Sequence, residues 1–303
     1  MLSQSGTVKA FGAYFGTDKL LHFHAVGYRY YKQYRSLLRS GLSPDEGIER
    51  VQLNHPSYYE EKGIELRLGE RVRAIDLASH QIKTSGAAIA YDRLMLTTGA
   101  RVRRLDLPGS TLPGVLYLRT IDDSEAIRDA LKRQARVVVI GGGFIGLEVA
   151  ASARKRGCHV TVLEATDRLM GRAVAPEVGT YFADLHRRHG TEIRLGTSLV
   201  RFEGAGRLER IVLADGSAIE ADLAVIGIGI VPNVELAGEA GLAIDNGIIV
   251  DDRGRTSDPH IFAAGDVANQ PNAFLGRRIR LESYQNAQDQ GMAVGRNMIG
   301  GDQ

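Results

Sequence analysis

Three glycines at fixed spacing, Gly141, Gly143 and Gly146, have the clearest chemical use in this chain. In the pattern Gly-x-Gly-x-x-Gly, the first glycine permits a tight turn and the second lets the backbone approach a pyrophosphate. The third glycine lets a helix pack close to a strand, and the phosphates bind the N–H groups at the start of that helix. The motif therefore predicts a dinucleotide-binding loop. The alternative is a glycine-rich turn that serves only packing.

One acidic residue, Glu164, follows Gly141 by 23 residues. This spacing is close to the roughly 20 residues expected of the acid that binds the ribose of a dinucleotide. A carboxylate at this position accepts hydrogen bonds from the ribose hydroxyls and repels a 2′-phosphate. The sequence therefore predicts binding of NADH in preference to NADPH.

The elements that must position these residues are also present. Residues 137–140 form a short β-branched run, which is typical of a strand buried on both faces. Residues 144–156 carry apolar side chains at helical spacing and end in two cations before a glycine, as helices often do. Residues 159–163 alternate as a second strand that leads into Glu164. The stretch is therefore a complete βαβ unit.

Length and composition restrict the class of protein. The 303 residues allow two domains, and a net charge of +2 with interspersed signs indicates neither nucleic acid nor an anionic surface as partner. The sequence has no apolar run long enough to span a bilayer and no signal-peptide pattern. Cys158 is the single cysteine, which excludes an intrachain disulfide and a CxxC redox pair, and its place in a predicted strand favours a core role. A cytoplasmic enzyme is predicted, and the oligomeric state stays open.

The first 50 residues differ from the rest of the chain. They contain eight of the 19 Phe and Tyr residues within the first 34 positions. The mixed basic and aromatic stretch at 20–38 is either a nucleic-acid patch or a helical or irregular lead-in. The lead-in is favoured because no nucleic-acid module accompanies the stretch. His22 and His24 have no third ligand at useful spacing, so no metal site is predicted.

Further elements are predicted from periodicity and turn residues. Strands are expected at 64–68, 72–77, 81–84, 87–90, 94 up to Gly99, 193–196, 199–203, 207–214, 217–220, 223–228 and 247–250. Helices are expected at 57–63, 123–133, 175–189, 234–240 and 283–299. Thr120 or Asp122 could cap the second of these helices. Proline and glycine pairs near 108–114 and 229–233 suggest two crossings between domains.

Several short motifs outside the glycine loop point to a known family. They are Tyr91-Asp-Arg-Leu, Thr98-Gly-Ala, Leu118-Arg-Thr, Gly227-Ile-Gly-Ile-Val-Pro-Asn, Ala264-Gly-Asp and Glu282-Ser. Together with the glycine loop they resemble the FAD-dependent ferredoxin reductases of bacterial oxygenase systems, of the putidaredoxin and rhodocoxin reductase type. These enzymes have the pyridine nucleotide–disulfide reductase fold, and the resemblance runs from about Gly63 to Gly295.

The resemblance implies a set of residues around FAD. Thr98 and Gly99 resemble the loop that returns the chain to the flavin domain, with Arg101 near the FAD. Asp266 resembles the acid that binds the ribitol hydroxyl of FAD, although it could instead be a simple helix cap. Glu282 resembles a residue near the stack of flavin and nicotinamide.

The resemblance also implies a set of residues around NADH. Phe144 and Ile145 belong to the matching glycine-loop motif. Glu148, placed on the first turn of the central helix, resembles a contact to the nicotinamide carboxamide, or else complements the helix dipole. Arg172 is assigned to the adenosine end of NADH, or else is a solvated arginine. Gly229 resembles the loop that lines the nicotinamide channel.

The fold implied is α/β, with two intertwined three-layer Rossmann-like domains. Residues 116–240 form a complete NAD(H)-binding domain, 51–115 and 241–303 form an incomplete, discontinuous FAD-binding domain, and 1–50 are atypical. In the family, NADH passes hydride from its C4 to flavin N5, and the reduced flavin gives single electrons to a [2Fe–2S] ferredoxin. The cofactors carry this chemistry, so no catalytic residue and no metal are predicted.

Two departures from the family pattern are expected to matter. The first strand, glycine loop and helix, which hold the ADP half of FAD, have no match, nor does the lysine segment beside flavin N5. The third, C-terminal domain also has no match. We therefore expect a truncated relative whose N-terminal segment comes from a rearranged or shifted reading frame. The alternatives are a module that binds NADH without flavin and a non-functional remnant.

Overall fold

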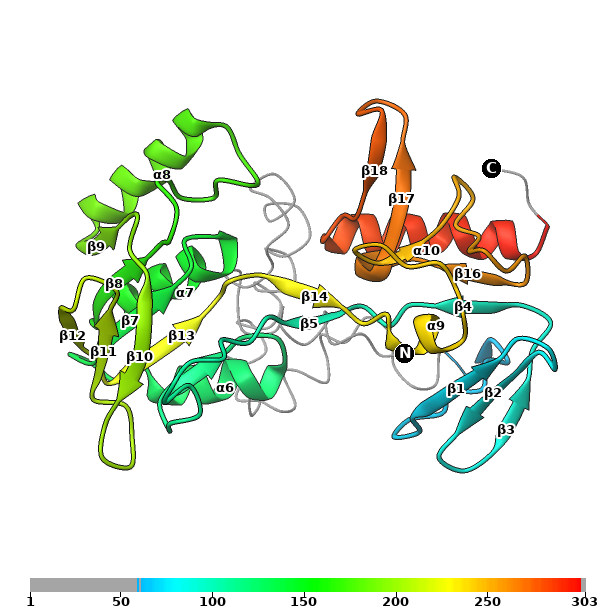
Figure 1. Cartoon of the computed structure of the whole chain (residues 1–303), viewed down its shortest axis with the longest axis horizontal. Coiled ribbons are helices and arrows are strands. Elements are labelled where there is room, and N and C mark those ends of the chain that lie inside the picture. The colour runs from blue at the N-terminus through cyan, green and yellow to red at the C-terminus, as the bar shows by residue number, and fades with distance from the viewer. Residues whose placement is uncertain (1–58, 60, 301–303) are drawn as a thin grey trace.

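The computed structural model describes Tyr59 and residues 61–300, which have an α/β architecture. The predictions made for residues 1–50, including those for His22, His24 and the stretch at 20–38, lie outside the described residues. Figure 1 shows two regions joined by the crossing strands β5 (Ala100–Val102) and β14 (Ile230–Pro232). We call residues 115–226 the five-stranded region, and residues 72–96 together with 235–298 the flanking region.

The five-stranded region is built on a parallel sheet with the order β6-β13-β7-β8-β9. Its strands are β6 (Val115–Tyr117), β13 (Leu223–Ile226), β7 (Arg136–Ile140), β8 (His159–Leu163) and β9 (Thr191–Arg194). The middle of β7 is at most 1% exposed, from Val137 to Val139, as expected of a strand covered on both faces. The prediction for β9 was two residues too late.

This sheet is the middle one of three layers. One face packs against α6 (Ile121–Ala130) and α7 (Phe144–Lys155) through a cluster that includes Ile127 and Val149. The other face packs against an antiparallel sheet of β10 (Leu199–Glu203), β11 (Arg210–Leu213) and β12 (Ala218–Glu220). The helix α8 (Pro176–Arg188) lies against β9 at the edge (Figure 1). A Rossmann-like layering therefore surrounds the glycine loop.

The flanking region is assembled from smaller sheets. The strands β4 (Leu94–Leu96) and β16 (Ile261–Ala263) form a parallel pair. A three-stranded antiparallel sheet contains β1 (Val72–Asp76), β2 (Gln81–Thr84) and β3 (Ala88–Ala90). A second three-stranded sheet contains β15 (Ile248–Ile249), β17 (Ala268–Asn272) and β18 (Arg277–Ile279), in which β17 pairs parallel with β15 and antiparallel with β18. Its helices are α9 (Glu235–Glu239), the short 3₁₀ helix Gly265–Val267 and α10 (Tyr284–Met298).

Several predicted elements were wrong or incomplete. Residues 64–68 form no strand, although their side chains alternate, because no described strand pairs with them; Ile64 and Leu68 are 48% and 61% exposed. The strands β5, β6, β14, β17 and β18 were not predicted. Of the two proposed caps, Thr120 caps α6: its Oγ1 accepts the N–H of Asp123 at 3.1 Å. The domain boundaries at 116 and 240 stay a prediction.

Candidate functional site

The glycine loop connects β7 to α7, and two of its glycines are required by their surroundings. Gly141 has φ of +104°, and a Cβ there would lie 2.5 Å from the carbonyl oxygen of Gly227, at the end of β13. A Cβ at Gly146 would overlap the carbonyl oxygen of Gly141 and lie 3.1 Å from Val139 Cγ1. A Cβ at Gly143 would meet nothing within 4 Å, so this side of the loop is open. The open side is where a ligand can approach the backbone.

The start of α7 is suited to bind an anion. The helix begins at Phe144 after Gly143, and no side chain caps its first N–H groups. A helix of 12 residues directs a positive dipole end and these N–H groups at the open side of the loop. Phe144 and Ile145 are half-buried in the first turn. The loop can therefore hold a phosphate without moving a side chain.

Glu148 lies one turn further along than predicted. The first turn of α7 contains no acidic residue, because the helix begins at Phe144 and Glu148 falls in the second turn. The helix-dipole effect decays within the first turn, so it explains little of this position. A contact from Glu148 to nicotinamide stays a prediction.

Glu164 lies directly against the glycine loop. Its Oε2 accepts the N–H of Gly142 at 2.7 Å, and its Oε1 accepts the N–H of Thr166 at 2.9 Å. Glu164 directly follows β8, at the carboxyl edge of the sheet, where the loop also begins. The structure therefore brings together the acid and the loop that the spacing had paired.

Arg172 lies beside Gly229, and Gly229 is on the loop that follows β13. Gly229 has φ of +105°, and a Cβ there would lie 3.2 Å from Arg172 Nη2. Ligands of parallel α/β sheets bind outside the carboxyl ends of the strands, and this pair lies at that edge. The two residues assigned to opposite ends of NADH are therefore neighbours, although their roles stay predictions.

A second group of polar residues lies where the two regions meet. Arg119 Nη2 lies 3.5 Å from Asp266 Oδ2 and 3.7 Å from the position of a Cβ on Gly99. Burial raises the pKa of Asp266, the Arg119 guanidinium counteracts this rise, and the nearby Glu282 carboxylate adds to it. Asp266 makes no side-chain cap at the 3₁₀ helix Gly265–Val267, so the helix-cap alternative does not describe it.

Thr98 and Arg101 hold the crossing between the regions. Thr98 Oγ1 donates to the Asn233 carbonyl at 2.7 Å, and Asn233 Nδ2 donates to the Thr98 carbonyl at 2.8 Å. Arg101 donates to Asn233 Oδ1 at 2.9 Å and pairs with Glu235 at 2.7 Å. Arg101 is thus engaged at the crossing, whereas Arg119 occupies the position beside Asp266.

Sequence reasoning missed two arginines in this group. Arg119 belongs to the Leu118-Arg-Thr motif, but no role was assigned to it; its place in that motif was the available signal. Arg280 is 7% exposed, donates to the Asp266 carbonyl at 3.0 Å and pairs with Glu282 at 2.7 Å. No local pattern pointed to Arg280, because the β17–β18 hairpin was itself not predicted.

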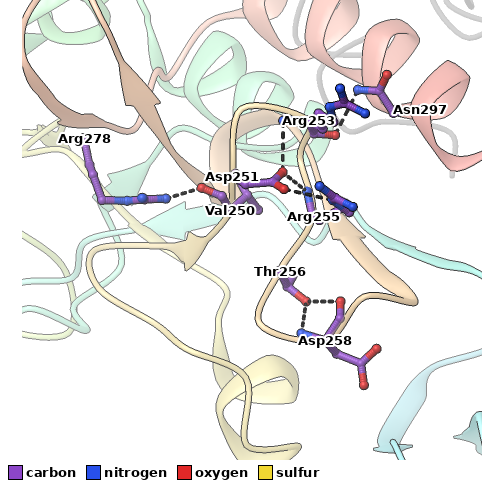
Figure 2. Close-up of polar contacts among 8 residues, drawn as sticks. All are labelled: Val250, Asp251, Arg253, Arg255, Thr256, Asp258, Arg278 and Asn297. Atoms are coloured by element: carbon purple, nitrogen blue, oxygen red, sulfur yellow. Dashed lines mark hydrogen bonds and ion pairs between the residues drawn. The ribbon is translucent and has the colours of Figure 1, made fainter. Parts of the chain in front are cut away.

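The segment before β16 is fixed by its own polar contacts, which Figure 2 shows. Asp251 Oδ1 accepts the N–H groups of Arg253 and Arg255 at 2.9 and 2.8 Å, and its Oδ2 pairs with Arg255 Nε at 2.9 Å. Thr256 Oγ1 accepts the N–H of Asp258 at 3.1 Å. These turns deliver the chain into β16, which ends just before Asp266.

Residues 61–300 contain no candidate membrane span and no candidate metal site. No described helix combines the length and apolar character needed to cross a bilayer. No group of three or more His, Cys, Asp or Glu side chains in this part of the chain could hold a metal ion.

Comparison with known proteins identifies the family. The model of the pyridine nucleotide-disulphide oxidoreductases matches residues 25–291. The chain belongs to this family. This match begins well before Gly63, where the sequence motifs had placed the start of the resemblance.

The chain is similar to ferredoxin reductases over most of its length. It is 43% identical to rhodocoxin reductase of Rhodococcus erythropolis over 87% of the chain and 62% of that relative. It is 42% identical to the ferredoxin–NAD(+) reductase component of an anthranilate 1,2-dioxygenase system of Burkholderia cepacia, over 88% of the chain and 66% of that relative.

A solved structure shows the same fold. The reductase in the covalent putidaredoxin reductase–putidaredoxin complex matches with a TM-score of 0.81 and 38% identity, over 89% of the chain and 66% of that structure. The chain therefore spans less than two thirds of the length of these relatives.

Proposed function

We propose that the chain binds NADH at the Gly141–Gly146 loop, as the nicotinamide-binding part of an FAD-dependent oxidoreductase that passes electrons to a [2Fe–2S] ferredoxin. The observation that carries the proposal is the uncapped start of α7, with Glu164 one hydrogen bond from the loop. The similarity to a ferredoxin–NAD(+) reductase component supports NAD as the nucleotide. The match to a reductase solved in complex with putidaredoxin supports a ferredoxin as the acceptor.

The residues of the loop would each act on a different part of NADH. The N–H groups at the start of α7 bind the pyrophosphate, which approaches over Gly143, where no atom lies within 4 Å of a Cβ. Glu164 accepts hydrogen bonds from the ribose hydroxyls and disfavours a 2′-phosphate. Arg172, beside Gly229, supplies a positive charge at the same edge of the sheet.

The residues around Asp266 fit the ribitol side of FAD. Arg119 Nε is buried and makes no hydrogen bond within the described structure, so this group retains a donor for a polar ligand. Asp266 would hold the ribitol hydroxyl, and Gly99 leaves space beside Arg119. When bound, FAD would supply the exchange between hydride and single-electron transfer.

A second candidate function is a module that binds NADH without flavin. In the part of the chain that the structure describes, the start of α7 is the single helix start that follows a Gly-x-Gly-x-x-Gly loop. Asp266 and Arg119 cannot replace the backbone N–H groups that a second pyrophosphate needs.

Two measurements on the purified chain separate these functions. We expect NADH to bind in a fluorescence titration and the absorption spectrum to show flavin bands near-stoichiometric with protein. A colourless protein that binds NADH would favour the module. Failure to bind either ligand would refute both functions.

A charge reversal tests the place of Glu164. We expect Glu164→Arg to change the ratio of the Kd values for NADH and NADPH by roughly tenfold or more, because an arginine there attracts a 2′-phosphate. Glu177→Arg, an equal charge change at an exposed position on α8, is the control and should leave the ratio unchanged. An unchanged ratio in both variants would contradict the assignment.

A further inference from the structure

Thr166 lies two residues after Glu164 and is exposed. We propose that Thr166 is a positioning residue that fixes the Glu164 carboxylate against the glycine loop and so sharpens the discrimination against a 2′-phosphorylated dinucleotide. This inference rests on the proposed binding of NADH.

Two donors of Thr166 hold one carboxylate oxygen. Its N–H lies 2.9 Å from Glu164 Oε1, and its Oγ1 lies 2.8 Å from the same oxygen. The hydroxyl also lies 3.0 Å from the carbonyl oxygen of Arg168. A hydroxyl has one proton, and a charged carboxylate is the stronger acceptor, so the hydroxyl donates to Glu164.

The backbone of Thr166 is itself fixed. The N–H of Gly196, which follows β9, donates to the carbonyl oxygen of Thr166 at 2.8 Å. The N–H of Thr197 donates to the carbonyl oxygen of Glu164 at 2.9 Å. The two donors of Thr166 are therefore presented from a turn that is anchored to the next strand of the sheet.

The other carboxylate oxygen is held by the glycine loop. Glu164 Oε2 accepts the N–H of Gly142 at 2.7 Å. A Cβ at Gly142 would overlap Leu169 Cδ2 and lie 3.2 Å from Glu164 Oε2. A side chain at position 142, which the general motif leaves free, would therefore require Leu169 or Glu164 to shift.

The three donors leave the carboxylate one defined direction for a ligand. A carboxylate has about four acceptor sites, and Thr166 and Gly142 use three of them. The remaining site is available to a ribose hydroxyl. Without the Thr166 hydroxyl, two N–H donors remain and the carboxylate can rotate more freely. The ribose hydroxyls of NADH then bind less tightly. The Glu164 carboxylate can also rotate away from a 2′-phosphate, so it repels NADPH less strongly.

The test compares Thr166→Val with Thr166→Ser in the intact chain. We expect Thr166→Val to raise the Kd for NADH about three- to tenfold, the value of one hydrogen bond, and to leave the Kd for NADPH unchanged or lower. Thr166→Ser retains the donor and should restore both values. Thr180→Val removes a hydroxyl that donates to the Pro176 carbonyl on α8 and is the matched control.

Each outcome decides the inference. Wild-type ratios in Thr166→Val, or equal weakening of both nucleotides, would overturn it. If circular dichroism shows that Thr166→Val does not fold, Thr166→Ala is judged by the same ratio. A wild-type chain that binds no NADH would refute the proposed function together with this inference, whereas normal wild-type binding with an unchanged variant would refute this inference alone.

Discussion

In the five-stranded region β13 lies between β6 and β7, whereas in the flanking region β4 pairs with β16 and with no other described strand. All four residues of β13 are at most 2% exposed. In β4, Leu96 is buried, but Leu94 and Met95 are half-buried. Among the described residues, the same kind of parallel strand is therefore central in one region and at an edge in the other.

The two regions repeat one succession of elements. An antiparallel three-stranded sheet precedes both β13 and β4, and each strand leads through a glycine, Gly229 or Gly99, into a crossing strand. Arg119 follows β6 by two residues, and Asp266 follows β16 by three, and these two side chains face each other. Nearly equivalent points of the two regions thus meet at their interface.

The backbone of β4 shows which of its groups have no partner strand among the described residues. The N–H of Leu94 donates to His260, and the carbonyl of Leu96 accepts from Ala264, at 2.9 and 3.1 Å. Alternate residues of a strand direct their N–H and C=O groups to opposite sides, so those of Met95 point away from β16. At the equivalent edge, β13 has β7 and its glycine loop. Within the described residues, the five-stranded region therefore has a glycine loop between a central strand and a helix, whereas the flanking region has only the residues that follow its parallel strands.

The largest expected effect breaks the packing that supports the phosphate site. Gly146→Ala places a Cβ against the Gly141 carbonyl, so we expect about 3 kcal/mol of lost stability and no measurable NADH binding. Gly143→Ala is the matched control, because its Cβ meets nothing within 4 Å. That variant should keep its urea midpoint and lose NADH affinity only. Equal stability of the two variants would contradict the packing argument.

A truncation in each parallel strand measures the difference between the regions. We expect Ile226→Ala in β13 to cost about 2 to 3 kcal/mol and Leu94→Ala in β4 about 1 kcal/mol, because Leu94 is only half-buried. Urea denaturation monitored by circular dichroism gives both values. Similar costs would show that β4 is covered as completely as β13.

The ion pair between Asp222 and Arg136 joins the starts of β13 and β7, and its contribution to stability can be measured. Asp222 accepts the N–H of Arg136 at 2.8 Å and pairs with its guanidinium at 2.7 Å. We expect Asp222→Ala to cost roughly 1 to 2 kcal/mol, and Asp167→Ala, at an exposed position, close to nothing. Hydrogen bonding to Arg136 lowers the pKa of Asp222 from 3.8, so its contribution is complete above pH 3.8 and is lost as the pH falls through the lowered pKa. A pH-independent difference between Asp222→Ala and the parent would refute this linkage.

The smallest effect has the opposite sign and lies in the flanking region. Burial raises the pKa of Asp266 above 3.8, so its contribution is complete below pH 3.8 and is lost as the pH rises through the raised pKa. At neutral pH we expect Asp266→Asn to raise the Tm of the flavin-free chain by roughly 2 °C and to weaken flavin binding. The gain in Tm should shrink as the pH falls toward the raised pKa. A lower Tm at neutral pH would show that the Arg119 pair outweighs burial.

Sequence reasoning succeeded where the signal was local. The βαβ unit from Val137 to Glu164 is predicted by features of consecutive residues: a β-branched strand, three glycines, apolar residues at helical spacing and a terminal acid. The candidate site around Glu164 followed from one spacing. The loops with Gly229 and Asp266 came from the family resemblance, which supplied roles that periodicity alone could not.

Several of the failures depend on residues that are distant in the sequence. Residues 64–68 alternate like a strand, but a strand exists only where a second strand accepts its hydrogen bonds. Ala100 to Val102 pairs with β14 some 130 residues later, and neither segment is long enough to signal a strand. Arg119 and Arg280 gain importance only because folding brings both to Asp266.

The paired crossing has a mechanical consequence. The chain passes between the regions twice, in β5 and in β14. These two strands pair antiparallel at Val102–Ile230, Arg101–Val231 and Ala100–Pro232. Two paired strands resist stretching more than bending. The two regions can therefore change their relative orientation more easily than their separation along β5 and β14. Bending of these paired strands would therefore change the separation between groups near Gly141 and groups near Asp266.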